Sequence, residues 1–230
     1  MVNLYCGREK IDSAEVSEKT GWKFCFDNLP ETDHNGKLYD YTVTEEPVKN
    51  YESLIEYEVK DNGKYVYITN RLLSGDLTVV KKIKSGEEDI WWEHGNPTFV
   101  IKVSGEGTDG KEYTFFHTYE FTREYVRENQ KNGMVTISYT FKDIPISEEY
   151  KIEEMCISRY KLESIKGNGD NVMIREEITG RGDAFFAMYA SVNLQKRPEG
   201  TEVELYNEKQ NYGWYGHNAY VENKIQLADF

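Results

Sequence analysis

The chain has 230 residues, a length that accommodates one large domain or two small ones with a hydrophobic core. Asp and Glu total 41 against 28 Lys and Arg, and the formal charge of -13 disfavours binding to nucleic acid or anionic lipid surfaces. No apolar run approaches the roughly 18 residues that span a bilayer, so we expect no membrane insertion and place any export signal outside this chain.

The cysteine and histidine content argues against a metal centre. The three cysteines include no CxxC pair, and the four histidines lie far apart in the sequence. We therefore expect neither a zinc site nor a dense disulfide framework. The sequence also has no glycine-rich phosphate loop and no nucleophile elbow, so we expect no cofactor and no enzyme that turns over a substrate.

The residue pattern predicts an all-β chain. Aromatic residues make up 14% of the sequence, with 18 tyrosines, and they favour strands over helices. Short alternating runs bounded by Gly, Asn, Asp or Pro are typical of β-sandwich strands. Two segments, 9–18 and 121–129, are candidate helices. In chain order, the predicted strands are 22–26, 38–44, 65–69, 77–83, 98–103, 134–141, 150–152 and 202–206.

An internal repeat divides the chain into two modules. The pattern F-x-(N/D)-(L/I)-P followed by Y-x-(V/I)-x-E occurs at residues 26–45 and again at 141–154. Each copy is followed later by a strand that ends in asparagine, at Asn70 and at Asn207. We therefore predict two tandem β-sandwich modules. They cover residues 1–73 and 76–225.

Strand alternation places three polar side chains of the second module on apolar faces. Lys81 shares a face with Val79, Glu154 shares one with Ile152, and Asn207 lies on the apolar face of its strand. An unpaired Lys or Glu that is buried costs several kcal/mol. Each of these groups must therefore be paired, neutralised or consumed by a reaction.

An intramolecular isopeptide bond would consume the buried charges. Desolvation lowers the pKa of a lysine and raises that of a carboxylic acid. The neutral amine of Lys81 could then attack the side-chain carbonyl of Asn207, with protonated Glu154 passing protons to the departing ammonia. The alternative is that the lysine and glutamate form an ordinary ion pair or snorkel to solvent, and that the asparagine is a turn residue.

The same residues carry a resemblance to a known family. The segments WKFCFDNLPETDHNGKLYDYTVTEEPVKNY and YVYITN resemble the Cna B-type (collagen-adhesin B repeat) domain of Gram-positive surface proteins and pilins. GDLTVVKKI, YKIEE and EGTEVELYNEKQNYGWYGHNAYVENKI resemble a longer pilin-like relative. The resemblance implies prealbumin-like, reverse immunoglobulin-like β-sandwiches, often locked by a Lys–Asn isopeptide bond. By position, Lys81 matches the family lysine, Glu154 the assisting acid and Asn207 the asparagine.

The first module departs from the family pattern. Glu45 and Asn70 match the acid and the asparagine, but the family lysine would lie on a strand before the one that begins at Val2. We therefore expect the first module to lack its opening strand and to form no Lys–Asn bond of its own. A donor strand from a neighbouring chain could fill this gap.

The resemblance implies a structural stalk or spacer segment of a bacterial cell-surface protein, pilin or adhesin, held outside the cell at the wall and joined to neighbouring modules. The alternative is a ligand-binding adhesin module that recognises a host matrix protein or a glycan through long insertions at 97–140 and 160–198. Within the second insertion, the integrin-type tripeptide Arg181, Gly182 and Asp183 is a candidate binding motif on a predicted turn.

Overall fold

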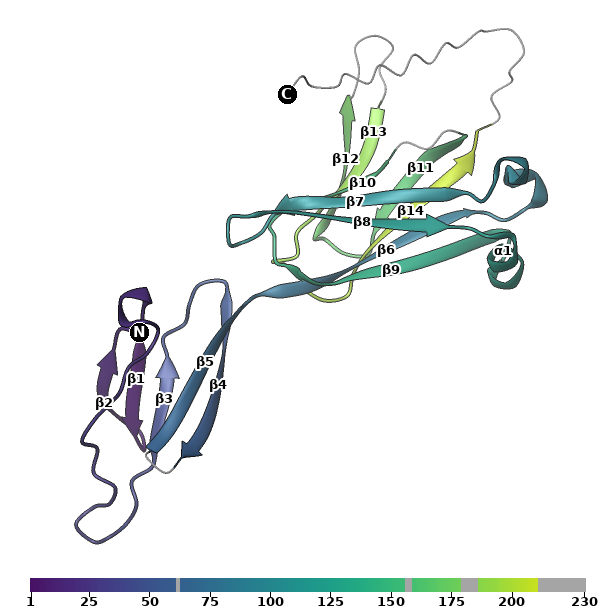
Figure 1. Ribbon diagram of the computed structural model, residues 1–230. Coiled ribbons are helices and arrows are strands. Elements are labelled where there is room, and N and C mark those ends of the chain that lie inside the picture. The colour runs from purple at the N-terminus through teal and green to yellow at the C-terminus, as the bar shows by residue number, and fades with distance from the viewer. Residues whose placement is uncertain (61–62, 156–158, 179–185, 211–230) are drawn as a thin grey trace, which may run out of the picture. The chain divides into compact units, whose positions relative to one another are not determined.

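The structure, a computed structural model, describes residues 1–60, 63–155, 159–178 and 186–210 (Figure 1). It is an all-β protein with one α-helix among these residues. The chain forms two compact units. Unit 1 consists mainly of Met1–Gly75, and unit 2 mainly of the residues from Asp76 onward.

Unit 1 consists of a three-stranded sheet and a two-stranded hairpin. In the sheet, β1 (Val2–Cys6) lies between β2 (Glu9–Ala14) and β3 (Tyr41–Glu45), and both pairings are antiparallel. The antiparallel hairpin comprises β4 (Tyr51–Lys60) and β5 (Gly63–Leu72). The Tyr57 hydroxyl of β4 donates to the carbonyl of Val43 in β3 at 3.0 Å, so the hairpin faces the sheet.

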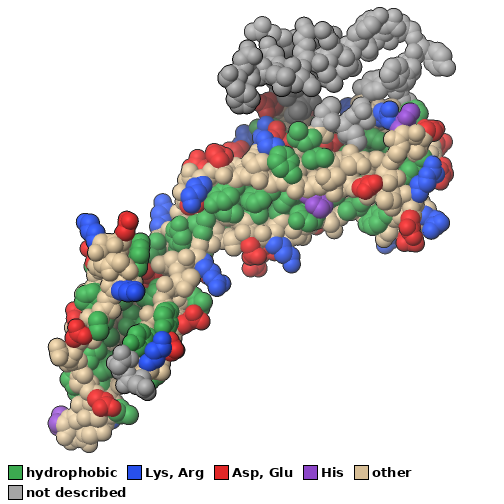
Figure 2. Space-filling model, in the orientation of Figure 1, with side chains coloured by type: hydrophobic (Ala, Val, Ile, Leu, Met, Phe, Trp, Pro, Cys, Tyr) green, Lys and Arg blue, Asp and Glu red, His purple; other side chains and the backbone are tan. Residues whose placement is uncertain are grey.

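The core of unit 1 is small. Within Met1–Gly75 the buried apolar side chains are Val2, Leu4 and Ala14, all from the three-stranded sheet. In the hairpin, by contrast, Tyr57 and Val59 remain exposed although they share the face that carries the Tyr57 contact to β3. Figure 2 shows hydrophobic side chains on the visible surface of this unit. The described residues therefore cover the inner face of the hairpin incompletely.

Unit 2 is a β-sandwich of two larger sheets. One sheet has the order β11-β14-β6-β9, in which β14 pairs with β6 in parallel and with β11 antiparallel. The other has the order β12-β13-β10-β7-β8, with antiparallel pairing throughout. The four strands of the first sheet are β6 (Ser74–Lys84), β9 (Met134–Pro145), β11 (Tyr160–Gly167) and β14 (Thr201–Lys209). The five of the second are β7 (Thr98–Glu106), β8 (Glu112–Glu120), β10 (Tyr150–Glu154), β12 (Val172–Ile178) and β13 (Phe186–Val192).

The core of unit 2 lies between these sheets and is rich in aromatic rings. The ring of Phe99 on β7 contacts Phe121 and Tyr160 edge to face, with centroids 5.8 and 5.3 Å apart. The buried hydroxyl of Tyr119 on β8 donates to the carbonyl of Val79 on β6 at 2.9 Å, linking the two sheets. Apolar residues at alternate positions of β6, β7, β10 and β14 fill the remaining space.

Two local predictions differ from the structure, and one is close to it. The helix expected at 121–129 forms as α1 (Arg123–Asn129), whose N-terminus is capped by the hydroxyl of Thr122 accepting from the Tyr125 amide. The candidate helix at 9–18 is wrong, because its first half pairs with β1 as strand β2. The predicted strand at 22–26 is also wrong: these residues lie outside every sheet, and Trp22 has a left-handed φ of 57°.

The segments expected to be insertions are parts of the sandwich itself. Residues 97–140 contain β7, β8, α1 and the beginning of β9, and the described part of 160–198 contains β11, β12 and β13. Their strands belong to both sheets, because each supplies an apolar inner face that needs a partner layer. They are therefore structural elements of unit 2 rather than appendages to it.

We expect Ile101→Ala to destabilise unit 2 by about 2–5 kcal/mol, because Ile101 on β7 is fully buried and its loss leaves a cavity. Lys102→Ala, one residue along and on the opposite face, is the matched control and should change stability by less than about 0.5 kcal/mol. Urea unfolding combined with hydrogen exchange of the unit 2 strands measures both changes. Equal effects of the two substitutions would contradict the inward orientation of Ile101.

Candidate functional site

Three central strands of unit 2 carry the residues of the candidate site. Lys81 lies on β6 and Asn207 on the parallel neighbour β14, where Leu205 is the partner of Lys81 in the register. Glu154 ends β10 in the opposite sheet. Each residue occupies an inward position of its strand, since the residues two before it, Val79, Leu205 and Ile152, are fully buried. The two sheets therefore bring an amine, a carboxamide and a carboxyl group together across the core.

The three side chains are in direct contact. The Lys81 amine lies 2.8 Å from Oε2 of Glu154 and is hydrogen-bonded to Oδ1 of Asn207. The Asn207 amide nitrogen donates to Oε1 of Glu154 at 2.5 Å. The amine also donates to the carbonyl of Leu205 at 3.4 Å, and the ring of Phe99 lies 4.4 Å from it. Each polar group of the triad therefore contacts both of the others.

The site is shielded from solvent. The side chains of Lys81 and Glu154 are 0% and 5% exposed, and Asn207 is fully buried. Burial lowers the pKa of Lys81 from its ordinary value, an effect that the charge and hydrogen bond of Glu154 oppose. Desolvation thus favours a neutral amine, while the carboxylate favours a charged one. A neutral amine next to a carboxamide is a nucleophile next to an acyl group.

In unit 1, the sequence pairs Glu45 with Asn70, and the structure brings these two together as well. The Asn70 amide donates to Oε1 of Glu45 at 3.0 Å, so the same atoms are joined as in Asn207 and Glu154. Among the described residues, however, the third partner is a hydroxyl: Ser53 Oγ contacts Oδ1 of Asn70 at 2.6 Å and is hydrogen-bonded to Oε2 of Glu45.

Ser53 is a site residue that the sequence analysis missed. It stands directly opposite Asn70 in the β4–β5 register, whereas the residue opposite Asn207 on β11 is Leu162. The sequence signal for Ser53 is the hairpin formed by residues 51–60 and 63–72. Aligning these two strands places Ser53 opposite Asn70. Unlike the triad in unit 2, both Ser53 and Asn70 are exposed.

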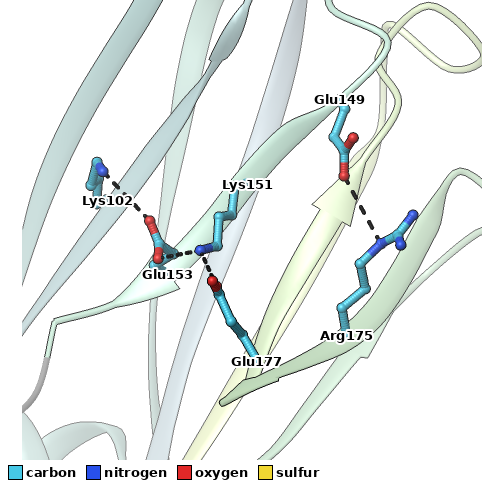
Figure 3. A network of polar contacts seen from close by, with 6 residues as sticks. All are labelled: Lys102, Glu149, Lys151, Glu153, Arg175 and Glu177. Atoms are coloured by element: carbon cyan, nitrogen blue, oxygen red, sulfur yellow. Dashed lines mark hydrogen bonds and ion pairs between the residues drawn. The ribbon is translucent and has the colours of Figure 1, made fainter. Parts of the chain in front are cut away.

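The outer face of the five-stranded sheet carries a separate charge network (Figure 3). The Lys151 amine lies 2.8 Å from the carboxylates of Glu153 and Glu177, and Lys102 lies 3.5 Å from Glu153. The hydrogen bonds that the Lys151 amine donates to the carboxylates of Glu153 and Glu177 raise its pKa. These side chains remain about a third or more exposed, and such pairs contribute only about 0–1 kcal/mol each. We interpret the network as a solvated surface rather than a functional site.

The candidate binding motif Arg181, Gly182 and Asp183 lies outside the described residues. Within the described ranges, no group of three or more His, Cys, Asp or Glu side chains is positioned to hold a metal ion. In the same part of the chain, no helix is long and apolar enough to cross a membrane.

The lowered pKa of Lys81 predicts a pH dependence of stability. Between this pKa and the ordinary lysine value of 10.5 the unfolded chain binds more protons than the folded one, so stability rises with pH in that window. The Asn207→Ala variant keeps a free amine, and its unit 2 should become more stable toward urea as the pH rises toward 10.5.

The matched control is the double variant Lys81→Met/Asn207→Ala, which has no titrating amine at this site. Its urea stability should depend less steeply on pH over the same window. If the two variants give parallel stability curves, the amine does not titrate differently in the folded and unfolded states.

Comparison with known proteins gives two matches. Residues 1–71 match the family model described as the Cna protein B-type domain. A collagen adhesin from Staphylococcus aureus is 31% identical over 147 residues, which cover 62% of this chain and 11% of the adhesin. The chain therefore spans about a tenth of the length of that relative. Residues 1–71 therefore match the Cna B-type domain family, and the all-β architecture of the chain agrees with this match.

Proposed function

We propose that the chain is a stalk or spacer segment of a bacterial cell-surface protein, and that an isopeptide bond between Lys81 and Asn207 stabilises its second unit. The observation that carries the proposal is the buried contact of the Lys81 amine with both Asn207 and Glu154. An ordinary ion pair between Lys81 and Glu154 would not need the carboxamide of Asn207. Here that carboxamide is hydrogen-bonded to both Lys81 and Glu154.

The proposed reaction occurs once per molecule. The neutral amine of Lys81 attacks Cγ of Asn207, the Nζ–Cγ bond forms and the Cγ–Nδ2 bond breaks. One amine proton passes through the carboxyl group of Glu154 to the leaving nitrogen, which departs as ammonia. The hydrogen bond between Asn207 Nδ2 and Glu154 Oε1 places the acid next to the leaving group. Burial supports the reaction, because it favours the neutral amine.

The bond would join the first and the last of the strands that the structure describes in unit 2. Lys81 and Asn207 are 126 residues apart in sequence, and closing a loop of this length restricts the unfolded chain by about 5 kcal/mol in the entropy model for disulfides. Because β6 and β14 are adjacent parallel strands, the linkage would also hold together the first and the last of the described strands of the sandwich. This property suits a segment that separates other modules of a surface protein.

The cellular setting is part of the proposal. The chain matches a short part of a collagen adhesin, so we place it in a surface protein of a Gram-positive cell wall, with further modules of the same protein as neighbours. The name of that relative, collagen adhesin, applies to the whole relative, and the match covers 11% of it. The described residues of unit 2 form a closed two-sheet sandwich, which favours the spacer function over ligand binding through insertions.

Mass spectrometry of the intact chain and of its proteolytic peptides tests the bond. The peptide that contains Lys81 should be joined to the peptide that contains Asn207, with the loss of one ammonia. Lys81→Ala and Asn207→Ala should abolish the linkage, and Glu154→Gln should slow its formation by at least about tenfold, because the proton carrier is lost.

Lys82→Ala is the matched control. Lys82 is the next residue on β6, faces outward and pairs with Glu204 at 3.5 Å, so its loss should leave the linkage intact. Two unlinked peptides of full mass from the purified, folded protein would refute the bond, whatever the melting temperature of the variants.

A second proposal concerns unit 1, whose Glu45–Asn70 pair would accept a lysine from a donor strand of another chain. In unit 2, the closing strand β14 lies between β11 and the lysine-bearing β6. The corresponding strand β5 pairs, among the described residues, with β4 alone. By the register of Lys81 with Leu205, the donor lysine would stand beside Ile68, two residues before Asn70. Such a strand would also cover the exposed apolar face of the hairpin.

A synthetic peptide with the sequence of residues 75–84 is a suitable donor, since β6 supplies the lysine in unit 2. Mixed with the full chain, it should become attached to Asn70, adding its own mass less one ammonia. The same peptide with alanine in the position of Lys81, and the variant Asn70→Ala, are the controls and should give no adduct. Absence of any adduct with the lysine peptide would overturn this proposal alone.

A further inference from the structure

The Ser53 hydroxyl occupies the same position relative to its acid and amide as the Lys81 amine does in unit 2. Ser53 Oγ contacts Oδ1 of Asn70 and Oε2 of Glu45, the same two atom types that the Lys81 amine contacts. In both sites the asparagine Nδ2 also donates a hydrogen bond to the glutamate Oε1, so that each of the three groups contacts the other two. A nucleophile, a carboxyl group and a carboxamide are thus arranged alike.

A count of protons shows how closely the three groups of unit 1 are coupled. The Ser53 hydroxyl has one proton and contacts two oxygens that are both acceptors, one on Asn70 and one on Glu45. It can therefore donate to only one of these two oxygens at a time. Together with the hydrogen bond that the Asn70 amide nitrogen donates to Oε1 of Glu45, these contacts form a closed ring through which a proton can move from the hydroxyl to the amide.

We propose that unit 1 modifies itself at Asn70 by attack of the Ser53 hydroxyl. Oγ of Ser53 bonds to Cγ of Asn70, and the bond from Cγ to Nδ2 breaks. The hydroxyl proton passes through Glu45 to the leaving nitrogen, which departs as ammonia. The product is an ester that links β4 to β5 at directly opposed positions of the hairpin. The reaction is the hydroxyl counterpart of the amine reaction proposed for unit 2, and it uses no residue of that unit.

Solvent exposure determines the fate of this ester. Ser53 and Asn70 are both exposed, in contrast to the buried triad of unit 2. Water therefore reaches the ester carbonyl and hydrolyses it, which regenerates the Ser53 hydroxyl and leaves an aspartate at position 70. The net change is the conversion of one carboxamide and one water into one carboxylate and one ammonium ion. The deamidated protein is the end product, and the ester is its precursor.

Peptide-level mass spectrometry of the full chain, aged at neutral pH, tests the inference. We expect either an ester between the peptides that contain Ser53 and Asn70 or an aspartate at position 70. Hydroxylamine added during ageing should intercept the ester and leave a hydroxamate at that position. Ser53→Ala should lower the rate of change at residue 70 by at least about tenfold, and Glu45→Gln should also lower it.

Ser53→Ala is an informative control because Ser53 is exposed and its truncation removes no core packing; circular dichroism verifies that the fold is kept. An intact carboxamide at residue 70, or aspartate formed equally fast in Ser53→Ala, would overturn the inference. The result is independent of the bond proposed for unit 2, because Lys81→Ala abolishes only that linkage. Capture of a lysine peptide by Asn70 does not require Ser53 but competes with it for the same carboxamide, so Ser53→Ala should keep or increase the yield of the peptide adduct.

Discussion

The amine of Lys81 must be accommodated without water, and this constraint determines the arrangement of unit 2. Transferring a charged amine into the core is costly, and the cost is offset only by groups that contact it directly. Glu154 comes from the opposite sheet and Asn207 from the parallel neighbour strand, so both sheets must close before all three groups meet. The ring of Phe99 then completes the enclosure. The stability of the sandwich and the chemistry of its site therefore depend on the same contacts.

The two units show how burial and the third group change the chemistry of one shared pair. Asn207 with Glu154 and Asn70 with Glu45 are joined through the same atoms. In unit 2 the pair is dry and meets an amine, and an amide formed there would be protected from hydrolysis. In unit 1 the pair is open to water and meets a hydroxyl, so any ester formed there would be short-lived. Under the two proposals, the same kind of acid and carboxamide would form a permanent link in one environment and a transient link in the other.

Surface charge and buried charge play separate roles in this protein. The lysines and glutamates on the outer face of the five-stranded sheet form exposed ion pairs, which are weak and replaceable. They keep the surface solvated, and the excess of acidic residues adds mutual repulsion between copies of the chain. The residues of the buried triad cannot be replaced at so little cost, because removing one of them would leave an uncompensated polar group in the core.

The sequence by itself determined the all-β class, the repeat and the inward positions of Lys81, Glu154 and Asn207, because strand alternation has a period of two and depends only on local order. It could not determine which strands are neighbours. The segment 9–14 became a strand because β1 pairs with it, and the segment 22–26 did not because no strand pairs with it. Ser53 entered the site of unit 1 only through the β4–β5 register. Contacts between residues far apart in sequence depend on sheet order and register, and these are decided when the whole tertiary structure forms.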